Sequence, residues 1–495
     1  MINSGMKRLL LVTGLCLLAE LGGCLSLAPV YHAPAPKTVA TFSENGAWAA
    51  GHPADQLPRG AWWGVFNDPA LSRMEEQLST ANPTLQVALA HYQAARDTLV
   101  QVRSQLFPSI TGAGGMLRNR QSANRPLRGA GQPSVYSSDL LGAGLSWDLD
   151  LWGQIRNVVA AQKATTQVQA ARLATVQLSL QSDLAASYMA MRGVDWEESV
   201  FDQDIHEFEI SYRITRDRFD GGIASGLDVS RAQEELSAIR ALRDHLVGKR
   251  AVLEHTVAVL LGTDPNVFHL PFNPQPIVLP KIPVGMPSQL LQRRPDVAAA
   301  ERELAAANAL IGVAKAAYFP NITLDAVGGF ESTGPSRWLS APNLFWGLGP
   351  SFLVPIFDAN AIAAQVAEAK ANYIAATAHY RATVLTAFKE VENQLASLNS
   401  EGQEAQDSLS ATQAAHQTAR LAFIQYKEGA VSYLEVAIAQ ATELQAERYD
   451  VTLQTRRIVD AVNLVRALGG GWDRSLLPSD AELSTQKLAS AGLPH

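Results

Sequence analysis

The chain has 495 residues, 47% of them hydrophobic and 18% charged, so it is long enough to bury a large core. Its formal net charge of −7, without a long run of basic residues, gives no electrostatic support for a nucleic-acid partner. The two cysteines, Cys16 and Cys24, both lie near the N-terminus, which excludes a fold stapled by internal disulfides.

Residues 1–23 have the pattern of a lipoprotein signal peptide. Lys7 and Arg8 precede an apolar stretch of about eleven residues, too short to span a bilayer about 30 Å thick. The following Leu-Gly-Gly-Cys resembles the bacterial lipoprotein box, in which the cysteine is lipidated and becomes the first residue. We predict a covalent lipid, diacylglycerol plus an acyl chain, on Cys24 and a lipid-anchored segment over residues 24–60. An ordinary signal peptide with a chance cysteine is the alternative.

The rest of the chain contains one pattern twice, about 207 residues apart. The shared positions include Gly222 and Gly429, Ser225 and Ser432, Leu227 and Leu434, and Leu261 and Leu468. A duplicated unit this long predicts pseudo-symmetry around an axis, as in a ring or tube, rather than a single pocket. The expected units are repeat 1 (residues 61–285), repeat 2 (residues 286–473) and a C-terminal tail (residues 474–495).

Each repeat contains strand-like alternation. Residues 145–151 alternate apolar and polar side chains without a slip, and residues 321–327 alternate in the same way as far as Ala326. Strands with one apolar and one polar face are typical of a water-filled membrane barrel, and a soluble sandwich is the alternative. Four strands cannot close a barrel, so an open channel needs several chains, and three would give twelve strands. The strands are expected near residues 106–118, 138–151, 319–331 and 344–357.

A very long helical segment follows each strand pair. Residues 154–220 contain no proline and one glycine, Gly193, and residues 359–428 contain no proline and one glycine, Gly402. At 1.5 Å per residue each segment forms about 100 Å of helix, and its many charged residues exclude a transmembrane helix. Beyond the shared turns the chain is expected to return as helices over residues 227–261 and 434–468, which makes two αα-hairpins.

Two blocks in repeat 2 resemble a known family. Residues 290–297, Leu-Leu-Gln-Arg-Arg-Pro-Asp-Val, and residues 311–320, Ile-Gly-Val-Ala-Lys-Ala-Ala-Tyr-Phe-Pro, are similar to the signature of the NodT-type outer-membrane efflux lipoproteins of the TolC-like family. Trp62-Trp63 before Asn67-Asp68-Pro69 also resembles it. The resemblance implies a mixed α/β membrane protein. In it, a homotrimer forms a twelve-stranded outer-membrane barrel that continues as a periplasmic α-helical barrel.

The resemblance also implies the partners and the location. Such ducts lie in the outer membrane of Gram-negative bacteria and dock onto a periplasmic adaptor and an inner-membrane transporter, commonly of the resistance-nodulation-division type. They pass drugs, metals or other small molecules outward while the transporter supplies the energy. The exit duct of a type I protein-secretion system is the alternative. No cofactor besides the lipid and no bound metal are expected.

The repeated turns are expected to form the periplasmic tip, where the adaptor would contact Gly222, Ser225, Gly429 and Ser432. The resemblance implies that acids near the start of the returning helices form rings at the constriction and that a tyrosine takes part in closing it. The matching positions are Glu435, Asp228 and Tyr426. The alternative for both acids is the ordinary preference for a carboxylate in the first turn of a helix.

The tip also departs from some relatives. Val431 stands where some relatives carry a basic residue, and Ile438 stands where some carry an acid. We therefore do not expect a salt bridge to lock this tip. An apolar constriction from Leu434 or Ile438 could close it by dewetting instead.

Two other classes of protein are disfavoured. The chain contains no Gly-x-Ser-x-Gly, His-Glu-x-x-His, phosphate-loop or Gly-x-Gly-x-x-Gly motif, and its ten histidines are scattered, so an enzyme is not expected. A structural coiled-coil lipoprotein would account for the helices and the lipid. It would leave the four alternating strands without a purpose.

Overall fold

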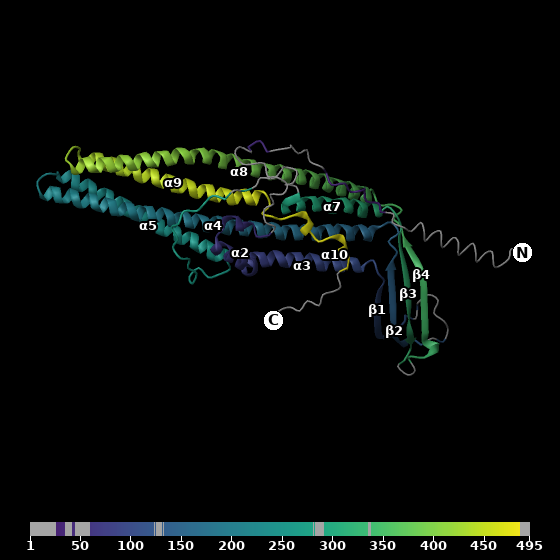
Figure 1. Cartoon of the computed structure of the whole chain (residues 1–495). Helices are drawn as coiled ribbons and strands as arrows, with labels where there is room; N and C mark the ends of the chain where they lie inside the picture. Colours follow the sequence, from purple (N-terminus) through teal and green to yellow (C-terminus); the bar gives the residue numbers. More distant parts are fainter. Residues whose placement is uncertain are drawn as a thin grey trace.

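A computed structural model of the chain describes residues 26–34, 42–44, 60–122, 124, 131, 133–280, 282, 292–334 and 338–485. The predicted lipid site, Cys24, lies outside these residues. The molecule is elongated, with helices along most of its length and a four-stranded sheet projecting at one end (Figure 1). Within the described residues, no helix is both long enough and apolar enough to cross a membrane.

The sheet is antiparallel throughout, with its strands in chain order. It consists of β1 (Ser109–Arg120), β2 (Val135–Asp148), β3 (Asn321–Ser332) and β4 (Leu344–Leu353). Partners across the strands share one face. Near the helices, a polar row contains Ser109, Ser146 and Asp325, and the next row contains Ile110, Leu145, Ala326 and Leu348. The predicted alternation of a polar and an apolar face is confirmed in these rows, whereas the rows at the far end of the sheet mix the two kinds, as in Leu140 with Glu331.

The strands end earlier than predicted on the side that faces the helices. β2 stops at Asp148 because Asp150 turns the chain with φ of 43°, and its carboxylate accepts hydrogen bonds from the backbone N–H groups of Ile155 (2.8 Å) and Arg156 (3.0 Å). β4 stops at Leu353, two residues before Pro355. The residues expected to extend these strands form the turns into the long helices instead.

Two long helices dominate the fold. α4 (Gln154–Asp220) and α8 (Ala361–Lys427) have 67 residues each, and the returning helices α5 (Gly226–Leu260) and α9 (Tyr433–Ala467) have 35 each. These bounds lie within two residues of the predicted ones. Gly193, the single glycine of α4, lies where α9 crosses, and a Cβ added there would be 2.3 Å from Thr455 Cγ2. The glycine thus permits the two hairpins to approach closely.

Four helices of the described residues were not predicted from the sequence. These are α2 (Pro69–Ala81), α3 (Pro83–Ser104), α7 (Pro295–Ala316) and the short α10 (Asp480–Thr485). The first three begin with a proline just after an N-cap residue, which is a readable start signal. α5 and α9 cover only about half the length of α4 and α8, and α3 and α7 pack along the remainder near the sheet (Figure 1). Each long helix is therefore accompanied by shorter helices from the sheet to the hairpin tips.

Glu75 on α2 is buried in the main core without a partner. Its exposure is 0%, and neither carboxylate oxygen has a hydrogen bond within the described residues. Burial raises the pKa of Glu75 to about 9, so the folded protein holds the carboxyl group protonated at neutral pH. The unfolded chain releases that proton above a pKa of about 4.5. The contribution of protonated Glu75 to the free energy of unfolding is therefore fully present below pH 4.5 and is lost as the pH rises toward 9.

We expect Glu75→Gln to raise the thermal midpoint at pH 7 or 8 and to change it little at pH 5. Glutamine needs no proton to stay neutral, so the gain at pH 7 is on the order of 3 kcal/mol. Thermal unfolding of the two proteins across this pH range measures the difference. Glu76→Gln, at an exposed neighbouring position, serves as the control and should show no such dependence. A gain for Glu75→Gln that is the same at pH 5 and pH 8 contradicts the buried, protonated state.

Candidate functional site at the hairpin tips

The two repeated turns lie together at the end of the molecule opposite the sheet (Figure 1). Gly222 and Gly429 occupy equivalent positions with φ of 73° and 78°, a left-handed conformation that favours glycine. A Cβ at either position would meet nothing within 4 Å. Ser225 and Ser432, the N-cap residues of α5 and α9, are exposed. The backbone of each turn therefore favours glycine at this position, and the space next to the glycine is empty.

Arg218 of α4 joins the two hairpins at the tip. Its guanidinium donates hydrogen bonds to the main-chain carbonyls of Tyr426 (2.6 Å) and Lys427 (3.0 Å), the last residues of α8. The same guanidinium lies 4.6 Å from the centre of the Tyr426 ring. A cation at the C-terminal end of a helix is favourable because the last carbonyls are unsatisfied and carry partial negative charge. Within the described residues, no ion pair joins the two tips.

A second layer of contacts lies just inside the tip. The Tyr426 hydroxyl donates to Thr215 Oγ1 of α4 (3.3 Å), and the Tyr433 hydroxyl of α9 donates to Glu235 Oε2 of α5 (3.2 Å). The two rings pack edge to face with centroids 5.6 Å apart, and both residues are buried. Farther in, Gln440 Nε2 donates to Ser211 Oγ (3.1 Å). The hairpins are thus held together by successive polar contacts around an aromatic pair.

The two predicted gate acids differ in their surroundings. Asp228 forms a capping box with Ser225, whose N–H and hydroxyl donate to Asp228 Oδ2 at 3.1 and 2.8 Å, so its carboxylate has the helix-capping role proposed as the alternative. Glu435 is exposed, and Ser432 makes no side-chain cap hydrogen bond. Glu435 and Ile438 line a groove of about 790 Å³ between α8 and α9. Leu434 and Ile438 are 39% and 55% exposed.

Tyr426 lies at the hairpin tips and contacts Thr215 of the other hairpin. Arg218 and Tyr433, which also join the two hairpins there, were not among the predicted residues. A signal for both existed in the repeat. Arg218 corresponds to Gln425 in the second copy, and Tyr433 corresponds to Gly226 in the first. Positions that differ between two otherwise similar turns are candidates for the contacts that join those turns.

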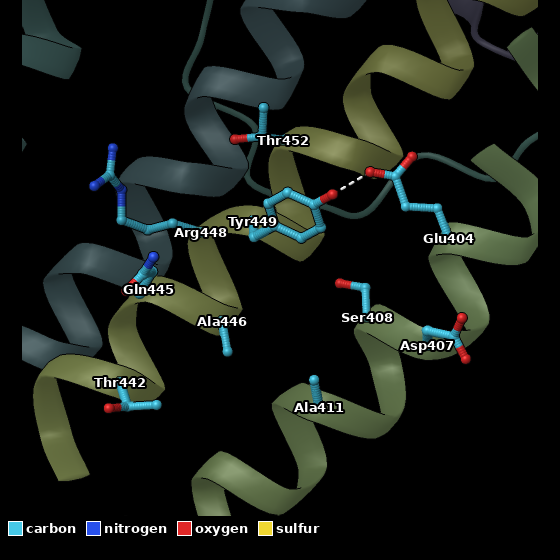
Figure 2. A pocket seen from close by; sticks show the side chains of 10 residues that line it. All are labelled: Glu404, Asp407, Ser408, Ala411, Thr442, Gln445, Ala446, Arg448, Tyr449 and Thr452. Carbon is cyan, nitrogen blue, oxygen red and sulfur yellow. Dashed lines mark hydrogen bonds between the residues drawn. The ribbon is translucent and has the colours of Figure 1, made fainter. Parts of the chain in front are cut away.

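A hollow of about 700 Å³ lies farther from the tip between α8 and α9 (Figure 2). Tyr449 donates to Glu404 in this hollow, and Arg456 donates to the same carboxylate (2.8 Å). These two contacts, the Tyr449 hydrogen bond foremost, hold the pKa of Glu404 below its ordinary value. Because an ionised carboxylate cannot donate a proton, Glu404 is not a general acid here. The hollow is a groove between the packed helices α8 and α9.

The profile of the outer membrane efflux protein family matches residues 76–263 and 286–470, one segment in each repeat. The chain belongs to the outer membrane efflux protein family. It is an outer-membrane protein with a transport role, and the sequence resemblance is confirmed.

Relatives and solved structures agree over nearly the whole chain. The antibiotic efflux pump outer membrane protein ArpC of Pseudomonas putida is 32% identical over 458 residues, which cover 91% of this chain and 93% of the relative. Outer membrane protein OprJ of Pseudomonas aeruginosa is 30% identical over 94% of this chain and 97% of its own. The outer-membrane channel OprN superposes with a TM-score of 0.84 at 29% identity, over 91% of this chain and all of that one. The open-state MtrE channel of Neisseria gonorrhoeae superposes with a TM-score of 0.79 at 26% identity, over 91% of this chain and 99% of that one.

Proposed function

We propose that three copies of this efflux protein form the exit duct of a tripartite pump. The duct passes small molecules from a periplasmic adaptor and an inner-membrane transporter, of the resistance-nodulation-division type, to the exterior. A lipid on Cys24 anchors each chain in the outer membrane. The observation that supports the proposal most strongly is a four-stranded sheet, too small to close into a barrel by itself, attached to helices long enough to form a tunnel.

The sheet is incomplete at its edges and on its apolar face. β1 and β4 each pair on one side only, which leaves two rows of backbone groups to be satisfied. Large apolar side chains are also exposed: Ile110, Trp346 and Leu348 are 73%, 76% and 68% accessible. Lipid would cover this face, and neighbouring copies would pair the edges. Three chains supply twelve strands, which suffice for a barrel wider than one filled by its own side chains.

The helices account for the rest of the duct. α4 and α8, with 67 residues each, reach about 100 Å at 1.5 Å per residue. The hairpin tips are farthest from the sheet and so deepest in the periplasm, where an adaptor would reach them. The open space around Gly222 and Gly429, with Ser225 and Ser432 beside it, supports these four residues as the adaptor contacts.

Native mass spectrometry of the detergent-purified protein tests the assembly, and a trimer is the expected species. A photo-crosslinking residue at Ser432 tests the docking surface in cells. It should capture the adaptor, whereas the same residue at Val267, an exposed position away from the tips, should not. A stable monomer, or equal capture from both positions, contradicts the proposal.

Glu435→Gln is expected to lower the preference of the channel for cations. In a trimer three copies of Glu435 would ring the entrance, and removing three negative charges weakens the attraction for cations there. Reversal potentials in planar lipid bilayers under a salt gradient measure this preference. Glu428→Gln, in the adjoining turn, provides a charge-matched control. Unchanged conductance and selectivity for Glu435→Gln would remove this residue from the gate.

A further inference from the structure

A cluster of ionisable side chains from α4, α8 and α9 lies between the hairpin tips and the sheet. His416 of α8 lies between two carboxylates of α9: its Nδ1 is 2.5 Å from Glu443 Oε1, and its Nε2 is 2.8 Å from Glu447 Oε1. One donor atom from each of these three residues lies within 4.8 Å of the others. Glu443 and Glu447 are four residues apart, so both project from one face of α9. An imidazole nitrogen and carboxylate oxygens are ligands that Zn²⁺ takes in proteins.

A buried carboxyl group from the opposite hairpin completes the cluster. Asp204 of α4 is only 8% exposed, and no hydrogen bond satisfies its Oδ2 within the described residues. Its carboxyl group is within hydrogen-bonding reach of Glu447 and close to the charge of His416. Two carboxyl groups in such contact must share a proton or a cation, because two buried negative charges repel each other. A cation bound here would also satisfy Asp204 Oδ2, which has no hydrogen bond within the described residues.

The cluster is accessible and has an excess of negative charge. A cavity of about 430 Å³ reaches it and is lined by Glu207, His416 and Glu443 among others. Arg420, which also lines the cavity, donates to Gln417 (3.3 Å). The four carboxyl groups of Asp204, Glu207, Glu443 and Glu447 therefore outnumber the two basic side chains named here, His416 and Arg420.

We propose that His416, Glu447 and Asp204 form a binding site for a divalent transition-metal ion such as Zn²⁺. His416 supplies Nε2 and the two acids supply one carboxylate oxygen each, while Glu443 keeps its contact with Nδ1 and orients the ring. A carboxylate on the second ring nitrogen is the usual support for a metal-binding histidine. The expectation from sequence that the chain binds no metal is replaced by this proposal.

The ion would tie the two hairpins together. Asp204 belongs to the α4–α5 hairpin and His416 and Glu447 to the α8–α9 hairpin. At 1.5 Å per residue, the three residues lie about 15 to 25 Å from the ends of their helices at the tip. The site is therefore set back from the Arg218 contacts and separate from them.

Metal binding is tested on the full-length protein, purified in detergent, freed of its affinity tag and treated with a chelator. Calorimetric titration with Zn²⁺ should give one ion per chain, and Co²⁺ should give the visible absorption bands of a low-symmetry site. His416→Ala and Glu447→Gln should each weaken Zn²⁺ binding at least about tenfold. His416 is more than half exposed, so its loss should leave the fold intact.

His379→Ala is the matched control. His379 is another exposed histidine of α8, 3.7 Å from a single carboxylate, Glu303, and its removal should leave Zn²⁺ binding unchanged. Zn²⁺ should also raise the melting midpoint of the wild type but not of His416→Ala. Absence of saturable Zn²⁺ binding, or equal affinity in wild type and His416→Ala, overturns the proposal. None of these readouts depends on transport or on the number of chains in the assembly.

Discussion

Arg218→Ala is expected to open the tip. The substitution removes two charge-assisted hydrogen bonds to the carbonyls of Tyr426 and Lys427 and the contact with the Tyr426 ring. Arg218 is partly exposed, so we discount these contacts for solvent and expect a loss of about 2 kcal/mol per chain. That loss shifts the ratio of open to closed tips roughly thirtyfold. Single-channel recordings in planar lipid bilayers should show several-fold higher conductance or open probability than the wild type.

Two further variants test whether the higher conductance comes from loss of the tip contacts and not from loss of charge. Arg216→Ala removes the same charge from the same helix. Because Arg216 donates only to Tyr212 (3.1 Å) among the described residues, the conductance of this variant should match that of the wild type. Tyr426→Phe loses the hydroxyl bond to Thr215 and keeps both the ring and the carbonyl, so a smaller opening is expected. Equal conductance for Arg218→Ala and the wild type would show that Arg218 does not hold the tip closed.

Arg294→Ala is expected to reduce the amount of folded protein in the outer membrane severely. Arg294 precedes α7, is 8% exposed and holds three elements together. Its guanidinium donates to Asp296 (2.6 Å), to Glu390 of α8 (2.6 Å) and to the carbonyl of Ala467 at the end of α9 (3.1 Å). Alanine leaves two carboxylates without their cation, at a cost of at least about 2 kcal/mol. Thermal unfolding and membrane abundance measure the loss.

Arg293→Ala is the control for this substitution. Arg293 is adjacent, carries the same charge and is more exposed, and its side chain makes none of these contacts. Arg294→Lys should remain well below the wild type, since an ammonium cannot form the paired hydrogen bonds to Asp296. If Arg293→Ala and Arg294→Ala unfold at the same temperature, the stabilising role assigned to Arg294 is wrong.

The repeat and the long helices could be predicted because their signals are local. The residues between 154 and 220 contain no proline, and the shared turn marks where the chain reverses. α3 and α7 were missed because they are shorter and lie between stronger patterns. Their prolines at positions 83 and 295 mark helix starts, but tertiary packing decides their role.

The candidate site was predictable only in part. Tyr426 and the turn glycines follow from the repeat and the family resemblance, whereas the partners of Tyr426 depend on how two hairpins pack. Asp204 and His416 are 212 residues apart in sequence, and only the fold brings their charges close together. The spacing of Glu443 and Glu447 was visible, but four-residue spacing of acids on a helix is common and does not by itself indicate a site.

Accumulation of fluorescent dyes and antibiotics in a strain lacking this gene tests the central claim most directly. The strain should contain no other member of the family, since a second duct would mask the loss. We expect higher accumulation and greater sensitivity than in the parent strain, restored by the wild-type gene but not by Arg294→Ala. Unchanged accumulation together with loss of a secreted protein would contradict the account and identify the chain as a protein-secretion duct.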